Sequence, residues 1–438
     1  MQQDDTPSGR GATRYDPKGV PGTRLRERLR EPPPGPARPG FWRSPVRGVR
    51  FTSVLGAVLL VGVPVLFVTG LLSYAAYNPD LRGNDTTPDR GWLGFYLFAW
   101  PTDPHWLYRL TQGVHVTLGI VLVPVLLAKL WSVVPKLFVW PPLRSAAHAL
   151  ERLSLLFLVG GVLFVFATGI LNVQLEYIFP GSFYPLHFYG SWVFIAAFVV
   201  HIATRVPVMV RALRGRRHTG DEDGLASPAP AAPTISRRGA LGVVGAGSLL
   251  LFVTTAGQSI GGSLRGTALF APHGQDPGPG PNGFQVNKTP AAVGIRPEEL
   301  GDDWRLVVRA GGRERVFTRA QLLALPQDEA ALPIACVEGW STGDQLWSGV
   351  RLARLGALVG GTAGEDEGVF VESVQSRGAF RSAALRDNQV GDRRSLLALR
   401  VNGADLSPDH GYPARVIVPA APGVHNTKWV TRLTFGAV

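Results

Sequence analysis

The stretch FTSVLGAVLLVGVPVLFVTGLLSYAAY, residues 51–77, contains no charged side chain and exceeds the roughly 20 apolar residues that a helix needs to cross a bilayer. Four later stretches are equally free of Asp, Glu, Lys and Arg: residues 111–128, 153–175, 182–204 and 239–264. Helices of soluble proteins seldom stay uncharged over such lengths, because one face normally meets water. The sequence therefore predicts an all-α transmembrane part, with a four-helix bundle and a fifth span after it.

The positions of Lys and Arg along the chain explain its positive net charge. The 438 residues carry a formal net charge of +12, yet only 17% of them are charged. Lys and Arg gather before the first span, between spans two and three, and between spans four and five. Loops rich in Lys and Arg face the cytoplasm in membrane proteins. We therefore expect a multi-pass protein with a cytoplasmic N-terminus, contact with membrane lipid and no nucleic-acid partner.

Composition divides the chain into five parts. Residues 1–44 are basic and rich in Pro, which predicts a disordered cytoplasmic tail. Residues 45–212 hold the first four spans, 213–235 form a cytoplasmic linker, and 236–264 hold the fifth span. Residues 265–438 are expected to form an extracytoplasmic α+β domain, because short apolar runs alternate there with turn residues. Strands are predicted at 304–308, 369–372, 396–401 and 415–419, and short helices at 319–325 and 352–358.

Histidines in or beside the spans are candidates for haem ligands, because ionisable groups in a membrane are costly. His187 and His201 lie fourteen residues apart, which puts them on nearly one helix face about 21 Å apart. His115 is predicted level with His187, and His148 level with His201. An imidazole pair on facing helices can hold a haem. We predict an outer haem at His115 and His187 and an inner haem at His148 and His201; the alternative is that they are packing residues, with His105 a rival outer ligand on the surface.

With these spans and histidines, residues 45–212 resemble the b561-like four-helix cytochromes b of bacterial membranes. The resemblance implies two b-type haems that carry electrons across the bacterial cytoplasmic membrane. It also implies the quinone pool or another membrane electron donor as partner. One departure is that the first span has no His, where many di-haem members carry a ligand. The inner pair therefore depends on His148.

The fifth span begins with Ser236-Arg237-Arg238-Gly239-Ala240-Leu241. This sequence resembles a twin-arginine export signal, which implies that the following domain folds around its cofactor before export. The alternative is that the two Arg residues anchor the span by their charge. The later glycines Gly242, Gly245 and Gly247 do not form a dinucleotide-binding loop, because no strand precedes them and no βαβ unit follows.

The only cysteine of the chain is Cys336, in LPIACVEGWS at residues 332–341. One Cys excludes an internal disulfide, a Cys-rich zinc site and an iron–sulfur cluster. A single buried Cys is usually structural, but the surrounding residues carry a recognisable pattern. It consists of CVEGW at 336–340, WSGV at 347–350, LLA at 396–398, NG at 402–403, HGYPAR at 410–415, Pro419, Gly423 and TKW at 427–429.

In this pattern residues 265–438 resemble the sulfite-oxidase-type molybdopterin oxidoreductases. The resemblance implies that the Cys336 thiolate binds molybdenum, which leaves oxygen positions open for exchange. Arg415 and Lys428 would bind the pterin phosphate by charge-assisted bonds; the alternative is solvated surface charge. The other implied pterin contacts are Asn282, Gln285, Val286, Ser373, His410, Asn426 and Thr427. For the first three, the alternative is an ordinary loop.

Glu338, two residues after the Cys, is similar to the acidic residue of the protein-methionine-sulfoxide reductase catalytic subunit, so we assign it a catalytic role with Cys336. The predicted function is a membrane-bound molybdopterin-dependent oxidoreductase. It would couple b-haem electron transfer to reduction of a small or protein-bound S-oxide or N-oxide. One alternative is sulfite-type oxidation that feeds electrons into the membrane, and another is a non-catalytic transmembrane electron carrier.

Overall fold

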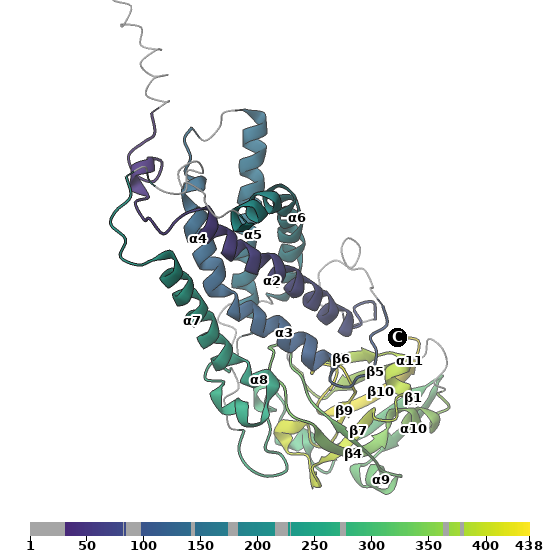
Figure 1. The fold of residues 1–438 in the computed structure, drawn as a ribbon. Coiled ribbons are helices and arrows are strands. Elements are labelled where there is room, and N and C mark those ends of the chain that lie inside the picture. Colours follow the sequence, from purple (N-terminus) through teal and green to yellow (C-terminus); the bar gives the residue numbers. More distant parts are fainter. Residues whose placement is uncertain are drawn as a thin grey trace, which may run out of the picture.

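The computed structural model describes residues 31–81, 83–84, 98–141, 145–173, 183–214, 227, 229–271, 277–361, 368–376 and 381–438. Most of the predicted tail 1–44 and about half of the predicted linker 213–235 lie outside these residues. Long helices form one end of the molecule, and a domain rich in β-strands forms the other end (Figure 1).

The described helices of the N-terminal half agree with the predicted apolar stretches. They are α2 (Val49–Ala76), α3 (Leu107–Val121), α4 (Val123–Leu137), α5 (Ala146–Asn172), α6 (Tyr184–Arg214), α7 (Arg237–Thr255) and α8 (Gly257–Ile260). Four described helical spans are long and apolar enough to cross a membrane: Val49–Ala76, His148–Asn172, Tyr184–Ala203 and Arg237–Ile260. The bent pair α3 and α4 makes a fifth if it counts as one span.

The second span is longer than predicted and is not straight. The sequence predicted one segment at 111–128, whereas α3 and α4 together cover Leu107–Val121 and Val123–Leu137 and meet at 41°. Pro124 lies in the first turn of α4. Proline has no N–H to donate to the preceding turn, and its ring crowds the carbonyl there, so it breaks or kinks a helix at this point.

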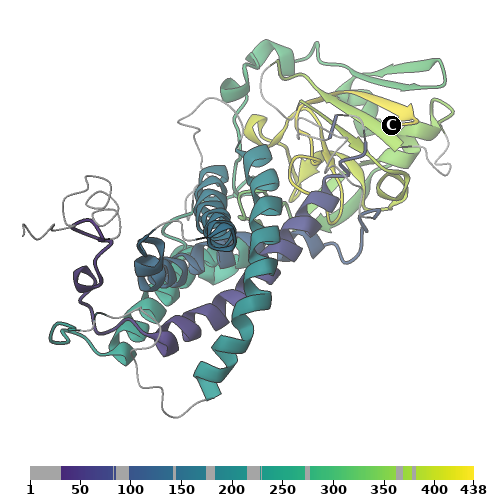
Figure 2. The same ribbon diagram turned by 90° about the horizontal axis from the view of Figure 1, so that it is seen from above.

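The helices pack around an apolar core, and α2 contacts α3, α4 and α6 along its length while α5 packs on α6. The core includes Phe51, Leu55, Val63, Leu122, Leu126, Phe194 and Phe198. On the outward faces, large apolar side chains such as Val61, Leu156 and Val243 are two-thirds exposed. Large apolar side chains exposed on uncharged helices are typical of helices that face lipid rather than water. Figure 2 shows the same helices from above.

The described residues of the C-terminal domain form two five-stranded sheets. The first has the order β2 (Arg313–Phe317), β1 (Leu306–Ala310), β10 (Val430–Gly436), β5 (Gly368–Ser373) and β6 (Ser382–Leu385). The second has the order β3 (Asp328–Leu332), β4 (Gln345–Arg351), β7 (Leu396–Val401) and β8 (Ala404–Asp405), with β9 (Arg415–Ile417) also paired to β7. Only β1 and β10 pair in parallel; the other described pairs are antiparallel.

Side chains from both sheets fill one core, which includes Leu306, Val350, Leu397, Val416 and Leu433. Short helices α9 (Arg319–Ala324), α10 (Leu352–Ala357) and α11 (Asp387–Gly391) connect the strands. The 3-10 turns are Pro39–Phe41, Gly262–Thr267, Ala291–Val293, Pro297–Leu300 and Pro408–His410. All four predicted strands and both predicted helices exist, within about two residues at each end.

The two halves are joined by side-chain contacts as well as by the chain. Asn84 exchanges two hydrogen bonds of 2.8 Å with the backbone of Ala384 in β6. Trp100 is buried and donates from its indole N–H to the carbonyl of Ala420 at 2.7 Å. Asp103 pairs with Arg394 at 2.8 Å. These contacts fix the domain against the ends of α2 and α3, which reach it in Figure 1.

Candidate functional site

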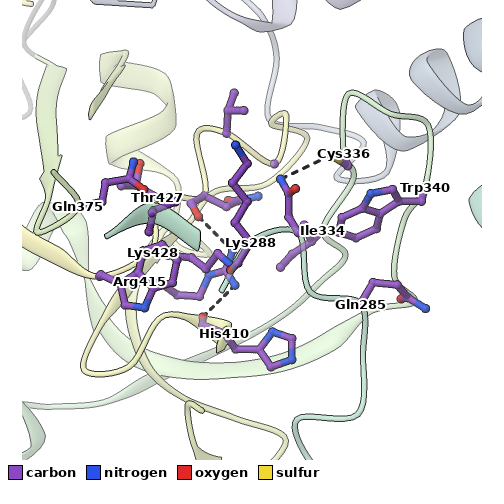
Figure 3. Close-up of a pocket in the computed structure, with 16 residues that line it drawn as sticks. Gln285, Lys288, Ile334, Cys336, Trp340, Gln375, His410, Arg415, Thr427 and Lys428 are labelled. Carbon is purple, nitrogen blue, oxygen red and sulfur yellow. Dashed lines mark hydrogen bonds between the residues drawn. The ribbon is translucent and has the colours of Figure 1, made fainter. Parts of the chain in front are cut away.

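A cavity of about 90 Å³ lies in the C-terminal domain where three loops meet. The loops follow β3, β5 and β9, and the segment 285–293 closes one side. His410 in the 3-10 turn Pro408–His410 and Arg415 in β9 also line the cavity. Figure 3 shows Cys336 and Trp340 on one side of the cavity and Arg415 and Lys428 on the other. The lining residues are Gln285, Asn287, Lys288, Val293, Ile334, Cys336, Trp340, Gln375, His410, Arg415, Gly423, Val424, Asn426, Thr427, Lys428 and Trp429.

Cys336 is held in a tight turn. Its N–H donates to the carbonyl of Trp340 at 2.9 Å, and its own carbonyl accepts from the N–H of Gly339 at 3.0 Å. Gly339 has a φ of +87°, a conformation that glycine adopts without the cost other residues bear. The turn directs the buried thiol to the cavity wall, where Asn287 Nδ2 lies 3.8 Å from the sulfur.

The surroundings of Cys336 are unsuited to a free thiolate. Burial, and the negative charge of Glu338, raise the pKa of the Cys336 thiol well above its usual value. The Glu338 carboxylate accepts a hydrogen bond of 2.8 Å from the indole N–H of Trp340, and Glu338 is not among the residues that line the cavity. A bound metal cation deprotonates a coordinating thiol outright. The site therefore suits a metal-ligating Cys better than a free nucleophile.

The opposite side of the cavity is cationic. Lys288, Arg415 and Lys428 line it, and none of the described lining residues is Asp or Glu. Arg415 donates to the carbonyls of His410 and Asn426, both at 3.0 Å, and burial lowers its pKa to about 9. Burial and the charge of Arg415 lower the pKa of Lys428 to about 7. Buried cations without a counter-charge are costly, so this side of the cavity suits an anionic ligand.

Several polar atoms around the cavity lack a partner. Gln285 Nε2, Arg415 Nε, Asn426 Nδ2 and Thr427 Oγ1 are buried and have no hydrogen-bond partner within the described part of the chain. Native proteins leave few buried polar groups unsatisfied. Three of these atoms carry N–H donors and the fourth is a hydroxyl, so together they indicate a polar ligand that supplies hydrogen-bond acceptors.

Seven predicted site residues line this cavity: Gln285, Cys336, His410, Arg415, Asn426, Thr427 and Lys428. His410 stacks on Phe284 with ring centroids 3.7 Å apart, and burial together with the Arg415 charge lowers its pKa to about 4. The sequence suggested no role in the site for Asn287, Lys288 or Gln375, and Trp340 and Trp429 entered only as members of the motif. The first two directly follow the predicted pair Gln285 and Val286, so extending that segment by two residues finds them.

Three predicted contacts, Asn282, Val286 and Ser373, are not among the described residues that line the cavity. The Asn282 side chain donates to the carbonyl of Asp405 and accepts from the N–H of Ser407, and its carbonyl lies 2.9 Å from His410 Nε2. Ser373 Oγ donates to the carbonyl of Lys428 at 2.8 Å. Val286 is absent from the described lining. Asn282 and Ser373 therefore hold lining residues in position.

The helices bring His115 and His187 together, with ring centroids 6.1 Å apart and ring planes at 89°. Nδ1 of His115 lies 3.0 Å from the carbonyl of Leu66, and Nδ1 of His187 lies 3.0 Å from that of Val165. An imidazole whose Nδ1–H donates to a carbonyl keeps the lone pair on Nε2, which is the usual arrangement of metal-binding histidines.

Both histidines are supported by the same local sequence. Phe67-Val68-Thr69-Gly70 in α2 contacts His115, and Phe166-Ala167-Thr168-Gly169 in α5 contacts His187. The Thr hydroxyls lie 3.1 and 3.3 Å from the two Nδ1 atoms. A Cβ on either Gly would approach the imidazole to about 3 Å, the distances being 3.1 and 3.0 Å. The repeated Phe-x-Thr-Gly is a signal that the sequence analysis missed.

His148 and His201 line one cavity of about 580 Å³ between α2, α4, α5 and α6. Nδ1 of His148 is buried without a hydrogen-bond partner in the described residues. The cavity wall is largely apolar but includes the four cations Lys129, Lys136, Arg152 and Arg205. His105, the rival outer ligand, instead lies 3.4 Å from Asp344 on the C-terminal domain.

Comparison with known proteins supports the assignment of the C-terminal domain. The family described as "Oxidoreductase molybdopterin binding domain" matches residues 293–437. Mitochondrial sulfite oxidase of Drosophila melanogaster is 31% identical over 171 residues, which cover 34% of this chain and 29% of that protein. The uncharacterized oxidoreductase YuiH of Bacillus subtilis (strain 168) is 32% identical over 112 residues, 26% of this chain and 54% of that protein. Sulfite oxidase of Arabidopsis thaliana is 34% identical over 107 residues, 21% of this chain and 27% of that protein.

These matches span from about a quarter to about half of the relatives' lengths. Residues 293–437 form a molybdopterin-binding oxidoreductase domain of the sulfite oxidase type, as the motif around Cys336 predicted. The cavity fits this cofactor in three respects. It offers a thiol for the metal, buried cations for a phosphate, and unsatisfied polar atoms for the pterin ring.

Proposed function

We propose that this chain is a membrane-bound molybdopterin oxidoreductase in which the helical part delivers electrons through b-type haems to the cavity at Cys336. The observation that carries the proposal is the pair His115 and His187. Nδ1 of each ring lies 3.0 Å from a backbone carbonyl, so Nε2 is the ring atom that would hold a haem iron. The centroids of this pair are 6.1 Å apart.

In the cavity, Cys336 would ligate molybdenum, which supplies two-electron oxygen-atom transfer when bound. Arg415 and Lys428 would neutralise the pterin phosphate, and this restores the charge balance that their burial lacks. His410, Gln285 and the residues 426–427 would bind the pterin. Glu338 would act from behind the cavity wall, where its carboxylate accepts the Trp340 indole N–H and its charge lies beside the Cys336 thiol.

The proposed reaction is reduction of an S-oxide or N-oxide. Two electrons and two protons convert a sulfoxide into a sulfide and water. A second candidate is sulfite oxidation with electrons passed into the membrane, which is favoured by the relatives named sulfite oxidase. Steady-state assays with methionine sulfoxide and with sulfite distinguish the two directions.

His148 and His201 would hold the inner haem. Their cavity has about 580 Å³, within the range of roughly 300–1,000 Å³ that ligand pockets occupy. Its cations Lys129 and Arg152 suit the two carboxylates that a haem carries. Electrons would enter from the quinone pool or another membrane donor.

We also propose an orientation with the N-terminus in the cytoplasm of a bacterium and the catalytic domain outside, on the basis of the basic loops. Arg237 donates to the carbonyls of Pro45 and Arg47, at 3.1 and 3.2 Å, and Ser236 Oγ caps the start of α7. These bonds support the anchoring role of the first Arg in the folded protein. A twin-arginine export role would act before this fold forms.

The test is metal and haem analysis of the purified wild type, Cys336→Ala, His187→Ala and His201→Ala. We expect molybdenum and two haems in the wild type. Cys336→Ala should keep its haem and lose activity, and each His variant should lose about half the haem. Molybdenum without haem in the wild type would refute electron delivery by the helices. Haem without molybdenum would favour a non-catalytic carrier.

A further inference from the structure

We propose that one face of α3, formed by Gln112, His115 and Val116, is the contact through which electrons pass between the helical part and the loop of Cys336. In this proposal Gln112 is a positioning residue that holds the loop to α3. The inference rests on the proposed function, because it requires a haem at His115 and molybdenum at Cys336.

The α3 face touches the Cys336 loop directly. The side-chain amide of Gln112 donates a hydrogen bond to the carbonyl of Val337, the residue after the Cys. The Val116 side chain packs on Gly339 so closely that a Cβ on this glycine would lie 2.6 Å from Val116 Cβ. Gln112, His115 and Val116 are spaced i, i+3 and i+4, so all three lie on one side of the helix.

A second element clamps the loop to the same helix. Ser259 in α8 donates from Oγ to the carbonyl of Gly339, and its own carbonyl accepts from Ser341 Oγ at 2.7 Å. The N–H of Ser341 donates to the carbonyl of Gln258 at 2.9 Å. Arg109 Nε, from α3, also donates to the Ser259 carbonyl at 3.1 Å. The clamp is buried, and Gln258 and Ser341 are nearly inaccessible to solvent.

The contact provides an almost continuous bonded route. It runs from the His115 imidazole along less than one turn of α3 to the Gln112 side chain, across one hydrogen bond to Val337, and along the backbone to Cys336. Some hydrogen bonds between the two halves, such as Asn78 to Gln389 at 3.0 Å and Asn84 to Ala384 at 2.8 Å, end on α11 and β6, far along the chain from Cys336. Those bonds orient the domain, whereas the α3 face joins the two redox sites.

Electrons would cross this contact singly. Each passage oxidises one ferrous haem iron to ferric and reduces the molybdenum centre by one electron. Two passages, with two protons from solvent, supply the reduction of one sulfoxide to sulfide and water. In the oxidation direction the same electrons would run from molybdenum to the ferric haem.

The experiment compares Gln112→Leu with Gln389→Leu in the full-length protein loaded with haem and molybdenum. The control variant is Gln389→Leu. Gln389 in α11 is also a buried Gln that joins the two halves, through its hydrogen bond with Asn78. In the reducing direction, protein with reduced haem is mixed with methionine sulfoxide. In the reverse direction, oxidised protein is mixed with sulfite. In both, the haem absorbance is followed by stopped flow. Turnover with a small viologen or ferricyanide dye, which exchanges electrons with molybdenum directly, is measured beside it.

We expect Gln112→Leu to slow the haem reaction by roughly tenfold or more, since small displacements of reacting partners carry losses of this size. Dye-linked turnover should stay within about twofold, and Gln389→Leu should leave both rates near wild type. Hydrogen–deuterium exchange of cofactor-free protein should be faster at residues 336–341 in Gln112→Leu. Ser259→Ala, which removes the bond from α8, should slow the haem reaction as well, and serves if Gln112→Leu does not fold.

An unchanged haem rate in both folded variants would overturn the proposal. Loss of dye-linked turnover along with the haem rate would overturn it too, because Gln112 would then shape the molybdenum site and not the route to it. Wild-type protein that lacks haem or molybdenum would instead show that the proposed function has failed, which the metal and haem analysis detects separately.

Discussion

Lys428 offers a test of whether the cationic side of the cavity was built for an anion. Its amine donates to the carbonyls of Lys288 and Asp409, and burial lowers its pKa from 10.5 to about 7. A cation held at such a cost should destabilise the protein when the cofactor is absent. Replacement by Met keeps the aliphatic stem and removes the charge.

The sign of the effect follows from proton binding. In the unfolded chain Lys428 keeps its proton up to pH 10.5, but in the folded chain only up to about pH 7. Between these pH values the unfolded state binds more protons, so the stability of the cofactor-free protein should rise with pH from about 7 to about 10. Below pH 7 the buried amine is protonated in both states, and its charge destabilises the folded state by the full difference between pKa 10.5 and about 7. At ~1.4 kcal/mol per pKa unit this difference is worth ~5 kcal/mol as an upper limit.

Loss of the two hydrogen bonds offsets part of this gain, by about 0.5–1.5 kcal/mol each. We therefore expect Lys428→Met to raise the free energy of unfolding by roughly 2–3 kcal/mol at pH 7, or about 5–10 °C in Tm. The assay is thermal unfolding of the cofactor-free, detergent-solubilised chain, followed by tryptophan fluorescence. Trp429 is a reporter, because the Lys428 amine lies 4.8 Å from its ring centroid.

Lys288→Met is the matched control, since it removes an exposed amine from the same cavity and should leave Tm nearly unchanged. With cofactor present we expect the order of stability to reverse, so that wild type is more stable than Lys428→Met. The reason is that Lys428→Met should bind the phosphorylated pterin more weakly than wild type. A Tm of Lys428→Met below that of wild type at pH 7, in cofactor-free protein, would refute the reasoning. So would a wild-type Tm that falls between pH 7 and pH 9.

Three further variants test other parts of the structure. Cys336→Ser should keep its haem content and lose catalytic turnover, as metal analysis beside an activity assay would show, because a hydroxyl does not replace a soft thiolate ligand. Gly169→Leu should lose about half the haem, measured by absorbance, because even a Cβ at this position would lie 3.0 Å from an imidazole. Gly160→Leu is the control and should keep its haem, because a Cβ there meets nothing within 4 Å. Gly339→Ala should lower the free energy of unfolding by at least about 1–3 kcal/mol, measured by thermal unfolding, because its φ is +87° and Val116 lies in the way.

Much of the fold was predictable because its signals are local. Each apolar stretch became a helix of the described chain, and β1, β5, β7 and β9 appear where short apolar runs lie between turns. The strands that were missed have weaker patterns. In β2 the sequence is RERVF and four of its five residues are exposed, so its hydrophobic signal is limited to the exposed Val316 and the buried Phe317. The bend at Leu122 was not predicted, because the stretch 111–128 indicates one span by its apolar composition alone, which does not include the effect of Pro124 on the helix.

The site was predictable where a residue type has one chemical use, and less so where geometry decides. Cys336, Arg415 and Lys428 carry charge or a thiol, and all three line the cavity. Asn282 and Ser373 were assigned to the same surface, yet their side chains bond to backbone and support their neighbours. A short polar side chain serves either purpose, and sequence spacing does not reveal which side of a loop it occupies.

The two histidine pairs differ in a way that follows from the chain itself. Thr69-Gly70 and Thr168-Gly169 repeat the same support on α2 and α5, so His115 and His187 each have a carbonyl near Nδ1 and a glycine against the ring. His148, in the first turn of α5, has a buried Nδ1 without a described partner. A metal-binding imidazole fixed by a second hydrogen bond is pre-oriented and more basic. The outer pair is therefore the better prepared of the two proposed haem sites, and it is also the pair whose helix α3 contacts the Cys336 loop.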